Sequence, residues 1–388
     1  MFLCNAQGAK MKVLVVGRTL PHKKSTSLGL FEYQQAAALN EKVQAGYLFT
    51  YTGSILQQHK FGIVSKTEKG LPIQGTHFPM KGLPRFLFNP IQSYIFKRAY
   101  RSFVRKNWKP DIIHFHFPLL VINQSIIRYL KEEGIPFVCT EHWSKVAAKK
   151  LNKYEKNLLK ATVDAADRFI CVSHPLKESV EALTGHRQLE VLPNMVDKNI
   201  FCGDRLNKNN QKNFRFTFIG RLVSSKRVDL LIPAFQKAFA DQPTVFLDII
   251  GDGPVRKSLE GLVEPDFRDR ILFHGQVPHN EIRSKLLTGN CFVSASNQET
   301  FGVPFIEAMA LGLPVIGADN LPITEYIGPE NGILFKTDCE EDLTAALVKM
   351  ASTAKSYDSD RIRQMAIDRF SPEKIVDSLV KTYQSLVE

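Results

Sequence analysis

The chain has 388 residues, of which 44% are hydrophobic and 23% are charged, as in an ordinary soluble globular protein. Its formal net charge is +12, and residues 1–200 carry 29 Lys and Arg against 14 Asp and Glu, so the basic excess belongs to the N-terminal half. No apolar run approaches the ~20 residues of a membrane-spanning helix, and "MFLCNAQGAK" lacks the pattern of a signal peptide, so we expect a loose leader of about ten residues.

The N-terminal half alternates short apolar runs with helical patterns. The apolar runs predict buried strands at 12–17, 44–50, 111–117, 135–142 and 168–173. Helical patterns such as "GLFEYQQAAALN" and "LVINQSIIRYLKEEG" lie between them. Alternating strands and helices predict a parallel sheet with helices on both faces.

A polar segment and a second alternating series follow. Residues 197–213 are rich in Asn and Lys, which is typical of a linker. Strands are then expected at 214–220, 244–251, 271–277, 291–295 and 313–318. The chain is therefore predicted to form two Rossmann-like, doubly wound domains that face a central cleft at the carboxyl ends of their strands. The predicted boundaries are 1–196 for the N-terminal domain, 197–213 for the linker, 214–370 for the C-terminal domain, and 371–388 for a final helix that packs back on the N-terminal domain.

The six cysteines are scattered and include no C-x-x-C pair. This spacing favours reduced thiols in a cytosolic protein over a disulfide framework. It also contains no zinc-binding pattern, so we expect no structural metal.

Cations follow the first strand of the second series. In "FIGRLVSSKRVD", Arg221, Lys226 and Arg227 lie between a strand and a helix. Cations beside helix N–H groups suit a pyrophosphate, but exposed loop cations are also common on any protein surface. The loop matches neither G-x-x-x-x-G-K-[ST] nor G-x-G-x-x-G.

Two glutamates flank a turn in "SNQETFGVPFIEAMALGLPVIGAD". Glu299 falls in the loop after a strand, and Glu307 is expected in the first turn of a helix that starts at Pro304. The alternative is that Glu307 only favours the helix dipole, by ~0.3–1 kcal/mol, and that Glu299 is an exposed loop acid. Their positions on different elements argue against a glycosidase-like acid–base pair.

The spacing of these glutamates in "ETFGVPFIEAMALGLPVI" resembles the E-x7-E signature of retaining glycosyltransferases of group 1, also called family 4. Companion stretches resemble the family in the same order: "VSHPLKES", "VLPNMVD", the "GRL" loop with its lysine, "IGDGP" and "HGQV". The resemblance spans most of the chain. It implies the GT-B architecture and transfer of a sugar from a nucleotide-sugar, a UDP- or GDP-sugar, with no metal or other cofactor required.

The resemblance implies roles for residues of the second domain. Arg221 and Lys226 would hold the pyrophosphate, and Glu307 would accept hydrogen bonds from the ribose. Glu299 would hold the donor sugar. Backbone contacts to the sugar and the base would come from Thr300, Phe301, Gly302, Val303, Gln276 and Val277. Fixed cations would stabilise the charge on the departing diphosphate more in the transition state than in the ground state. In the family's usual proposal the departing phosphate takes the acceptor proton, so neither glutamate needs to be a general base.

In the N-terminal half, the resemblance places His142 of "TEHWS" in the donor-sugar pocket and implies that Gly29 lets the backbone approach the phosphate. His114 and His116 alternate along a strand, so we expect at most one of them, His116, to face the cleft. The family often has two adjacent glycines near the position of Gly29, and this chain does not.

A second departure from the family lies after the E-x7-E stretch. The family often has a Gly-Gly pair where Asn320 and Leu321 stand here. Backbone contact with the donor phosphate is therefore expected to differ at this position.

Residues 81–110 contain eight Lys and Arg and no acidic residue, interleaved with aromatic residues. A basic helix of this kind suits an anionic membrane surface, although a core helix with a solvated basic face has the same pattern. No recognised nucleic-acid-binding module accompanies the charge, so we expect no nucleic-acid partner.

These features favour a retaining, metal-independent glycosyltransferase. Its acceptor is expected to be a glycan or lipid-linked saccharide of cell-surface polysaccharide or glycolipid biosynthesis, reached from the cytoplasm or the inner face of the membrane. The alternatives are a non-catalytic nucleotide-sugar binding protein and a sugar-nucleotide epimerase of similar fold. Epimerases lack the E-x7-E set, and retention of both glutamates, Arg221 and Lys226 argues against the binding protein.

Overall fold

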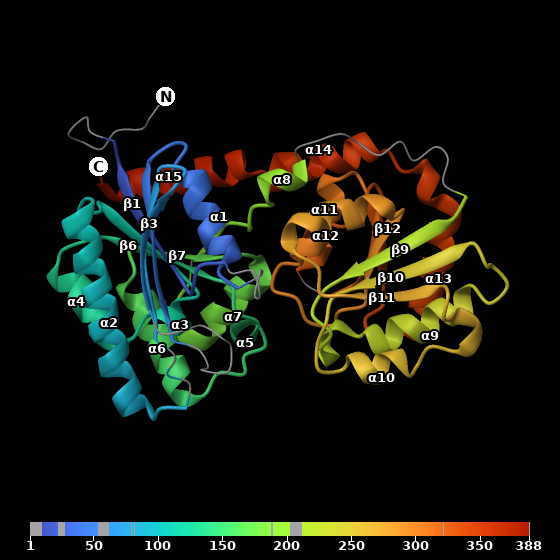
Figure 1. Ribbon diagram of the computed structural model, residues 1–388, viewed down its shortest axis with the longest axis horizontal. Helices are drawn as coiled ribbons and strands as arrows, with labels where there is room; N and C mark the ends of the chain where they lie inside the picture. The colour runs from blue at the N-terminus through green and yellow to red at the C-terminus, as the bar shows by residue number, and fades with distance from the viewer. Residues whose placement is uncertain are drawn as a thin grey trace. The chain divides into compact units, whose positions relative to one another are not determined.

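The computed structural model describes residues 10–21, 28–52, 62–78, 80, 82–187, 189–201, 212–320 and 322–387. The chain divides into two compact units, Met1–Met195 with Pro372–Glu388 and Val196–Ser371. Each unit is a mainly parallel sheet flanked by helices (Figure 1), so the predicted class of two Rossmann-like α/β domains is confirmed. Most of the predicted leader and the centre of the predicted linker lie outside the described residues.

The sheet of the first unit has the strand order β3-β4-β2-β1-β5-β6-β7-β8. Neighbouring strands are parallel except β3, which pairs antiparallel with β4. The five apolar runs correspond to β1, β2, β5, β6 and β7. The strands are β1 (Lys12–Gly17), β2 (Gln44–Tyr51), β3 (Gly62–Glu68), β4 (Leu71–His77), β5 (Ile112–His116), β6 (Phe137–Glu141), β7 (Arg168–Cys171) and β8 (Glu190–Val191).

The antiparallel hairpin of β3 and β4 does not follow from the apolar runs. β3 lies at the edge of the sheet, and its residues are exposed or half-buried, so it shows no continuous apolar run. The turn that joins the strands is Lys69-Gly70, with φ of 48° and 78°. Two positive φ values in a two-residue loop are typical of a hairpin turn, and glycine is the residue that adopts them most readily.

The first unit contains seven described helices from the N-terminal half of the chain and also α15, the last helix of the chain. The last helix packs against α1 and contributes Ile375, Leu379 and Tyr383 to the core that also contains Val13 and Val15 of β1. None of the described helices is both long and apolar enough to span a membrane. The helices are α1 (Leu30–Leu39), α2 (Arg85–Lys106), α3 (Pro118–Val121), α4 (Gln124–Glu132), α5 (Ser144–Ala147), α6 (Lys153–Ala165), α7 (His174–Thr184) and α15 (Pro372–Val387).

The second unit has a fully parallel sheet of order β11-β10-β9-β12-β13-β14. Five of its strands match the predicted runs, and β14, which follows a polar turn, does not appear among them. The strands are β9 (Phe214–Ile219), β10 (Val245–Ile250), β11 (Ile271–Gly275), β12 (Cys291–Ser294), β13 (Val315–Ala318) and β14 (Gly332–Phe335).

The core of the second unit is rich in phenylalanine. Rings of Phe216, Phe235 and Phe239 pack edge to face or tilted between β9 and α9, as aromatic rings prefer. The helices of this unit are α8 (Lys198–Phe201), α9 (Val228–Ala238), α10 (Arg256–Glu260), α11 (His279–Thr288), α12 (Val303–Ala310), α13 (Glu340–Thr353) and α14 (Ser359–Phe370). Short 3₁₀ turns cover Ser224–Lys226, Pro265–Phe267, Ile323–Glu325 and Ala354–Ser356.

Candidate functional site

The predicted donor residues lie in loops that leave two neighbouring strands of the second unit. β9 and β12 are neighbours although the chain visits β10 and β11 between them. Such a point, where the direction of the crossovers reverses, is where open α/β sheets bind ligands. The loop after β9 contains Arg221 and Lys226, and the loop after β12 contains Glu299.

Lys226 and Glu299 form a direct ion pair, with Nζ 2.5 Å from Oε1, although they are 73 residues apart. The two loops are also joined through the backbone carbonyl of Ser225, which accepts the N–H of Asn297 at 3.0 Å and the hydroxyl of Ser296 at 3.1 Å. The structure therefore brings together the cation predicted for the pyrophosphate and the acid predicted for the sugar. Arg221 is exposed on the same loop as Lys226.

Asn320, one of the two departures from the family's glycines, supports this arrangement. Its side-chain N–H donates to the carbonyl of Ser296 at 2.6 Å. The side-chain amide of Asn320 thus links the loop after β13 to the loop that carries Glu299. Leu321 lies outside the described residues.

The turn after Glu299 has a fixed backbone. Gly302 has a φ of 83°, and a Cβ at this position would lie 2.5 Å from the hydroxyl oxygen of Tyr326, so glycine is required. That hydroxyl donates to the carbonyl of Phe301 at 2.6 Å. Helix α12 begins at Val303, and the first N–H groups of a helix have no partners within it. The backbone of Phe301 and Gly302 is thus fixed by packing and by this hydrogen bond, and the binding role of the turn stays a prediction.

Glu307 lies in the second turn of α12, whereas the sequence predicts the first, because the helix begins before Pro304. Its side chain is 5% exposed, and burial raises the pKa of the carboxyl to about 7, although nearby His279 lowers it. The helix-dipole interpretation therefore does not explain this residue. A carboxyl buried at this cost points to a role in binding.

His279 and Asp197 lie near Glu307, and neither is predicted from the sequence as a site residue. His279 Nε2 lies 3.1 Å from Asp197 Oδ2. Burial lowers the pKa of His279, but the hydrogen bond to Asp197 and the charge of Glu307 outweigh it and raise the pKa. Asp197 is the first residue of the segment predicted as a linker. Because its neighbours in sequence are polar, nothing in the sequence indicates that it contacts His279 of α11.

Gln276 and Val277 follow β11 at the same edge of the sheet. The adjacent loops pack backbone to backbone: the N–H of Gly251 donates to the carbonyl of Gly275 at 2.8 Å. Gly251 has a φ of 142°, and a Cβ there would lie 1.8 Å from the carbonyl oxygen of Gly220. This close packing joins the loop of Gln276 and Val277 to the loop that begins with Gly220 and Arg221.

In the first unit, the crossovers reverse between β1 and β5. Arg18 follows β1, and its guanidinium carbon lies 3.5 Å from the centre of the Phe117 ring, which follows β5. The Arg18 Nε donates to Glu32 Oε1 at 2.7 Å. Phe117 has a φ of 52°, a strained value for an aromatic residue, and such strain gathers at functional sites. Neither Arg18 nor Phe117 belongs to a motif that could be recognised in the sequence.

His142, the predicted donor-pocket histidine, joins this group. Its ring stacks on Phe117 with centroids 4.6 Å apart, and its Nε2 lies 2.9 Å from Nδ1 of His116. Burial, with the charge of Arg18, lowers the pKa of His142 to about 3, so the imidazole is neutral near pH 7. The side chains of His116 and Asn194 both hydrogen-bond this ring.

His114 and His116 lie on the same side of β5, and the orientation of His116 toward a cleft stays a prediction. Residues two apart in a strand share one face of the sheet, and the two rings stack with centroids 4.5 Å apart. His114 lies deeper, with Nδ1 2.6 Å from the hydroxyl of Tyr383 on α15 and Nε2 2.7 Å from the hydroxyl of Thr140. Only His116 is hydrogen-bonded to His142.

Glu141 fixes the backbone that carries His142. One carboxyl oxygen, Oε1, accepts the N–H groups of His142 and Trp143 at 2.9 and 2.8 Å. Burial raises the pKa of Glu141 to about 7, although these two hydrogen bonds and Arg18 lower it. This acid is therefore a positioning residue for the histidine.

Acid is expected to destabilise the first unit. Burial lowers the pKa values of His114, His116 and His142, so the unfolded chain, with histidine pKa values of about 6.5, binds more protons than the folded chain below that pH. Glu141 acts in the opposite sense, because its raised pKa lets the folded chain keep a proton that the unfolded chain loses. Three histidines and one opposing glutamate leave the unfolded chain with about two more bound protons than the folded chain. Below pH ~6 the unfolding free energy should therefore decrease by about 2–3 kcal/mol for each unit by which the pH is lowered.

Urea unfolding of the full chain between about pH 5 and pH 7.5, followed by the fluorescence of Trp108 and Trp143, which both lie in the first unit, measures this slope. Replacement of His116 by asparagine removes one buried imidazole, and the slope should decrease by about 1.4 kcal/mol per pH unit. A slope identical to that of the unmodified chain would contradict the assignment of His116 as a buried neutral group.

Gly29 is the N-cap residue of α1 and has a φ of 79°. A Cβ at this position would lie 2.1 Å from the carbonyl oxygen of Thr19, so close packing on the loop after β1 requires glycine here. Its role toward a phosphate stays a prediction.

The first unit contains a cavity of about 530 Å³ beside Arg18. Residues of α2, of the segment 119–122 and of α6 line it, and most of the lining side chains are apolar. Its charged and amide-bearing side chains are Arg18, Arg85, Asn89, Gln92 and Glu155.

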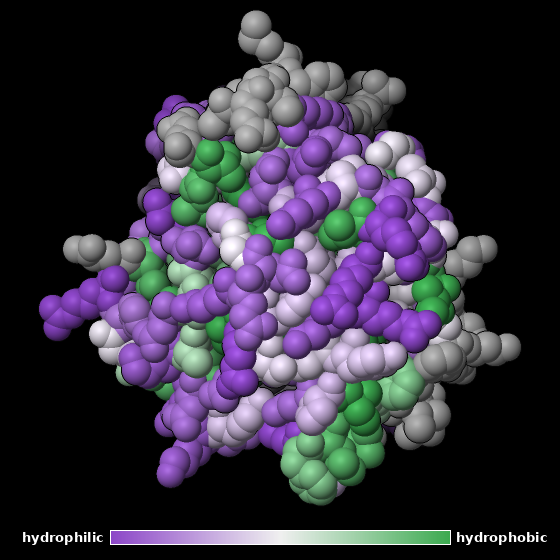
Figure 2. Space-filling model, turned by 90° about the vertical axis from the view of Figure 1, so that its left-hand side faces the viewer, coloured by the Kyte–Doolittle hydropathy of each residue, from purple (hydrophilic) through white to green (hydrophobic). Residues whose placement is uncertain are grey.

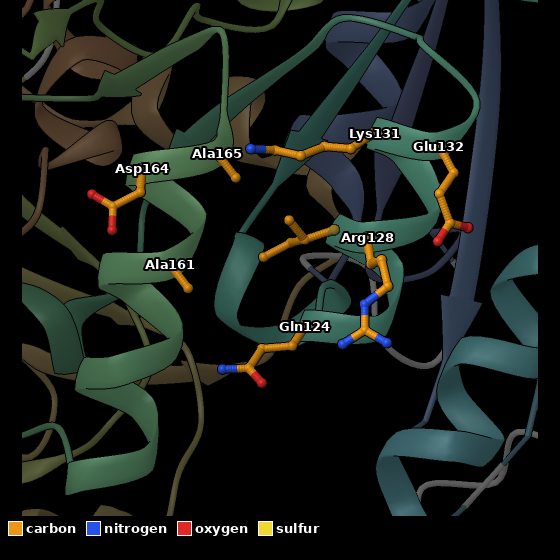
Figure 3. Close-up of a pocket in the computed structure, with 8 residues that line it drawn as sticks. Gln124, Arg128, Lys131, Glu132, Ala161, Asp164 and Ala165 are labelled. Atoms are coloured by element: carbon orange, nitrogen blue, oxygen red, sulfur yellow. The ribbon is translucent and has the colours of Figure 1, made fainter.

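A second hollow lies between α4 and α6 (Figure 3). Lys131 extends from α4 toward Ala165 of α6, and Gln124, Arg128 and Asp164 also line the hollow. None of the candidate residues described above lines it. It is therefore set apart from the candidate site.

Two family models match the chain one after the other. The model for Glycosyltransferase Family 4 matches residues 55–199, and the model for Glycosyl transferases group 1 matches residues 204–364. The second match contains Arg221, Lys226, Glu299 and Glu307.

Curated relatives align over most of the chain. It is 29% identical over 240 residues to a phosphatidylinositol N-acetylglucosaminyltransferase gpi3 subunit from Schizosaccharomyces pombe, covering 61% of this chain and 52% of that protein. It is 27% identical over 296 residues to the putative teichuronic acid biosynthesis glycosyltransferase TuaC from Bacillus subtilis, covering 74% of this chain and 69% of that protein. The chain spans about half the length of the phosphatidylinositol N-acetylglucosaminyltransferase subunits that it matches.

Solved structures of GT-B glycosyltransferases share the fold. A sucrose-phosphate synthase from Thermosynechococcus elongatus has a TM-score of 0.78 at 18% identity, covering 97% of this chain and 99% of that one. The Anabaena protein HepE, solved with UDP and glucose, has a TM-score of 0.72 at 17% identity, covering 97% of this chain and 100% of that one. At these identities the likeness establishes the architecture.

Proposed function

Since this chain belongs to family 4 of the group 1 glycosyltransferases, we propose that it moves a sugar from a UDP- or GDP-sugar to a hydroxyl of a glycan or lipid-linked saccharide, with retention of the anomeric configuration. The observation that carries this proposal is the ion pair of Lys226 and Glu299 at the switch point of the second unit. It joins a phosphate-binding cation and a sugar-binding acid across two loops.

The donor is held by three sets of groups in the second unit. Lys226 and Arg221 bind the diphosphate, which competes with Glu299 for the ammonium of Lys226. Once its ion pair with Lys226 is weakened, Glu299 accepts hydrogen bonds from the sugar hydroxyls. The backbone N–H groups of Thr300 to Val303 also contact the sugar. Glu307 accepts hydrogen bonds from the ribose, and the backbone at Gln276 and Val277 meets the base.

Transfer breaks the bond between the anomeric carbon and the phosphate oxygen, and the electron pair passes to that oxygen. The acceptor hydroxyl attacks from the same face, and its proton goes to the departing phosphate. Lys226 and Arg221 stabilise the charge that develops on the leaving group, so we propose that no metal is required. His142, neutral at pH 7, is proposed to hydrogen-bond the donor sugar.

The acceptor and the location rest on other observations. Two of the matched relatives are named a phosphatidylinositol N-acetylglucosaminyltransferase subunit and a putative teichuronic acid biosynthesis glycosyltransferase, which supports a glycan or glycolipid acceptor. We place the protein in the cytoplasm, in peripheral contact with the inner face of an anionic membrane through residues 81–110.

Incubation of the full chain with a panel of UDP- and GDP-sugars tests the proposal. Release of nucleoside diphosphate from at least one donor is expected, with and without EDTA, and NMR of the product should show the donor's anomeric configuration. Donor binding without any release would support a non-catalytic binding protein instead. Inversion at the anomeric carbon would contradict the retaining step.

A further inference from the structure

Two strained residues of the second unit are bound to each other. Five residues other than glycine have a positive φ in the parts of the chain that the structure describes, and Arg227, at 49°, and Asp338, at 60°, are two of them. Their side chains form an ion pair although they are 111 residues apart. A residue with a side chain adopts this left-handed conformation only at a cost in energy, and such strain gathers at functional sites.

Stability alone does not account for this pair. The side chain of Asp338 is 46% exposed, and an exposed ion pair stabilises a protein only weakly because water screens both charges. A gain of that size does not exceed the cost of two left-handed residues. Glycine would adopt both conformations without strain but would lack the charges. The two charged side chains therefore indicate a role beyond the stability of the fold.

Asp338 also contacts the loop after β12. The side-chain amide nitrogen of Asn297 donates to Oδ1 and Oδ2 of Asp338 at 3.4 and 3.3 Å. The backbone N–H of Asn297 donates to the carbonyl of Ser225, two residues before Arg227, at 3.0 Å. We call Arg227, Asp338 and Asn297 the loop clamp, because they join the loops that follow β9, β14 and β12.

Arg227 fixes the backbone beside Lys226. It ends the 3₁₀ turn Ser224–Lys226 and is also the N-cap residue of α9. Its N–H donates to the carbonyl of Ser224 at 3.1 Å. The left-handed backbone of Arg227 thus turns the chain from the 3₁₀ turn into α9 immediately after Lys226. A contact that holds the guanidinium of Arg227 therefore also limits the movement of Lys226.

We propose that the loop clamp positions Lys226 by holding the loops after β9 and β12 together when the donor diphosphate draws Lys226 away from Glu299. This inference rests on the proposed function. In the free protein three contacts join the two loops: that ion pair, the backbone hydrogen bond to Ser225, and the loop clamp. The loop clamp contains neither Lys226 nor Glu299, so it persists when their ion pair opens. It keeps the ammonium where charge develops on the leaving group.

Replacement of Arg227 by glycine separates positioning from stability. Glycine removes the cation of the loop clamp and relieves the backbone strain, so the midpoint of thermal unfolding should stay within about 2 °C of the unmodified chain or rise. The value of kcat/KM for the nucleotide-sugar should nevertheless fall about tenfold, mostly in kcat, because Lys226 is less well placed in the transition state. An unchanged kcat/KM would overturn the positioning role.

Lys69→Gly is the matched control. Lys69 is exposed in the turn between β3 and β4 of the first unit and has a φ of 48°, so the change removes the same charge and the same kind of strain. Figure 2 shows a largely hydrophilic face over elements of the first unit. Loss of one exposed cation from a surface of this kind has little effect. This variant should keep kcat/KM within about twofold.

A double-variant cycle with Asp338→Gly tests whether the two charges act as one unit. Asp338→Gly should also lower kcat/KM about tenfold, and the double variant with Arg227→Gly should lose no more than either single variant. Losses that multiply in the double variant would overturn the loop clamp. If Arg227 instead bound the diphosphate directly, removal of Asp338 would free its guanidinium and lower KM for the donor. That result would overturn the positioning role.

Hydrogen–deuterium exchange of the free protein tests the loop clamp without a donor. Peptides that contain Asn297 report the N–H that donates to Ser225, and their exchange should be about tenfold faster in Arg227→Gly but unchanged in Lys69→Gly. Equal exchange in Arg227→Gly and the unmodified chain would overturn the loop clamp. Faster exchange in a chain that releases no diphosphate from any donor would overturn the proposed function and leave the loop clamp standing. Release with equal kcat/KM in Arg227→Gly would overturn this inference alone.

Discussion

Replacement of Lys226 by alanine is expected to lower kcat/KM for the nucleotide-sugar by a factor of ~10²–10³. The ammonium stabilises charge that appears on the diphosphate only as the anomeric bond breaks, so the loss should fall on kcat more than on KM. In the free protein Lys226 is paired with Glu299 at 2.5 Å. Its removal also leaves that acid without its cation, which should weaken the grip on the donor sugar.

Steady-state release of nucleoside diphosphate measures the effect of this change. Lys237, an exposed lysine on the helix that follows the loop, provides the control, and Lys237→Ala should keep kcat/KM within about twofold, as expected for an exposed cation remote from the loop. A loss below about threefold in Lys226→Ala would mean that Lys226 is an ordinary surface cation.

Replacement of Glu307 by glutamine is expected to weaken donor binding while it stabilises the fold. A glutamine keeps one acceptor oxygen but loses the charge, so KM for the donor should rise by about 10–100-fold if the carboxylate binds the two ribose hydroxyls. Burial raises the pKa of Glu307 from 4.5 to about 7. At pH 8 the carboxylate of Glu307 is therefore charged and buried in the folded chain but charged and hydrated in the unfolded chain, which destabilises the fold.

The sign of the stability effect follows from proton binding. Between pH 4.5 and about 7 the folded chain binds more protons at Glu307 than the unfolded chain, so its stability falls as the pH rises through this window. Glu307→Gln removes this cost, and the unfolding free energy should increase by about 1–3 kcal/mol at pH 8 and by much less at pH ~5. Glu281→Gln, at an exposed position of α11, is the control. Unchanged KM together with unchanged stability would show that Glu307 is neither strongly buried as a charge nor bound to the donor.

The apolar runs predict most of the sheet positions because a strand buried on both faces has few polar residues. The alternation of strands and helices predicts the parallel pairing within each series. The hairpin of β3 and β4 escapes this signal, since an edge strand needs no apolar run, although Lys69-Gly70 is a turn signal in the sequence. The E-x7-E spacing predicts Glu299 and Glu307 as donor-binding residues, and the "GRL" stretch predicts the loop of Lys226.

The rest of the candidate site depends on contacts that no local pattern contains. Arg18 lies on Phe117, Asp197 binds His279, and α15 brings Tyr383 to His114 across 269 residues. Sequence position suggests no pairing in any of these cases. The contact of His116 with His142 also appears only in the folded chain, although His114 and His116 share one face of their strand.

By itself, the sequence determined the fold class, the family and the residue types available for the donor, because each depends on local periodicity or on spacing within one segment. Tertiary structure alone decided which charges meet. The order of the strands sets β9 beside β12 and so joins Lys226 to Glu299, and burial on α12 turns Glu307 from an ordinary helix acid into one whose pKa is about 7. Both effects act through space, between groups that are distant along the chain or in an environment that only folding creates.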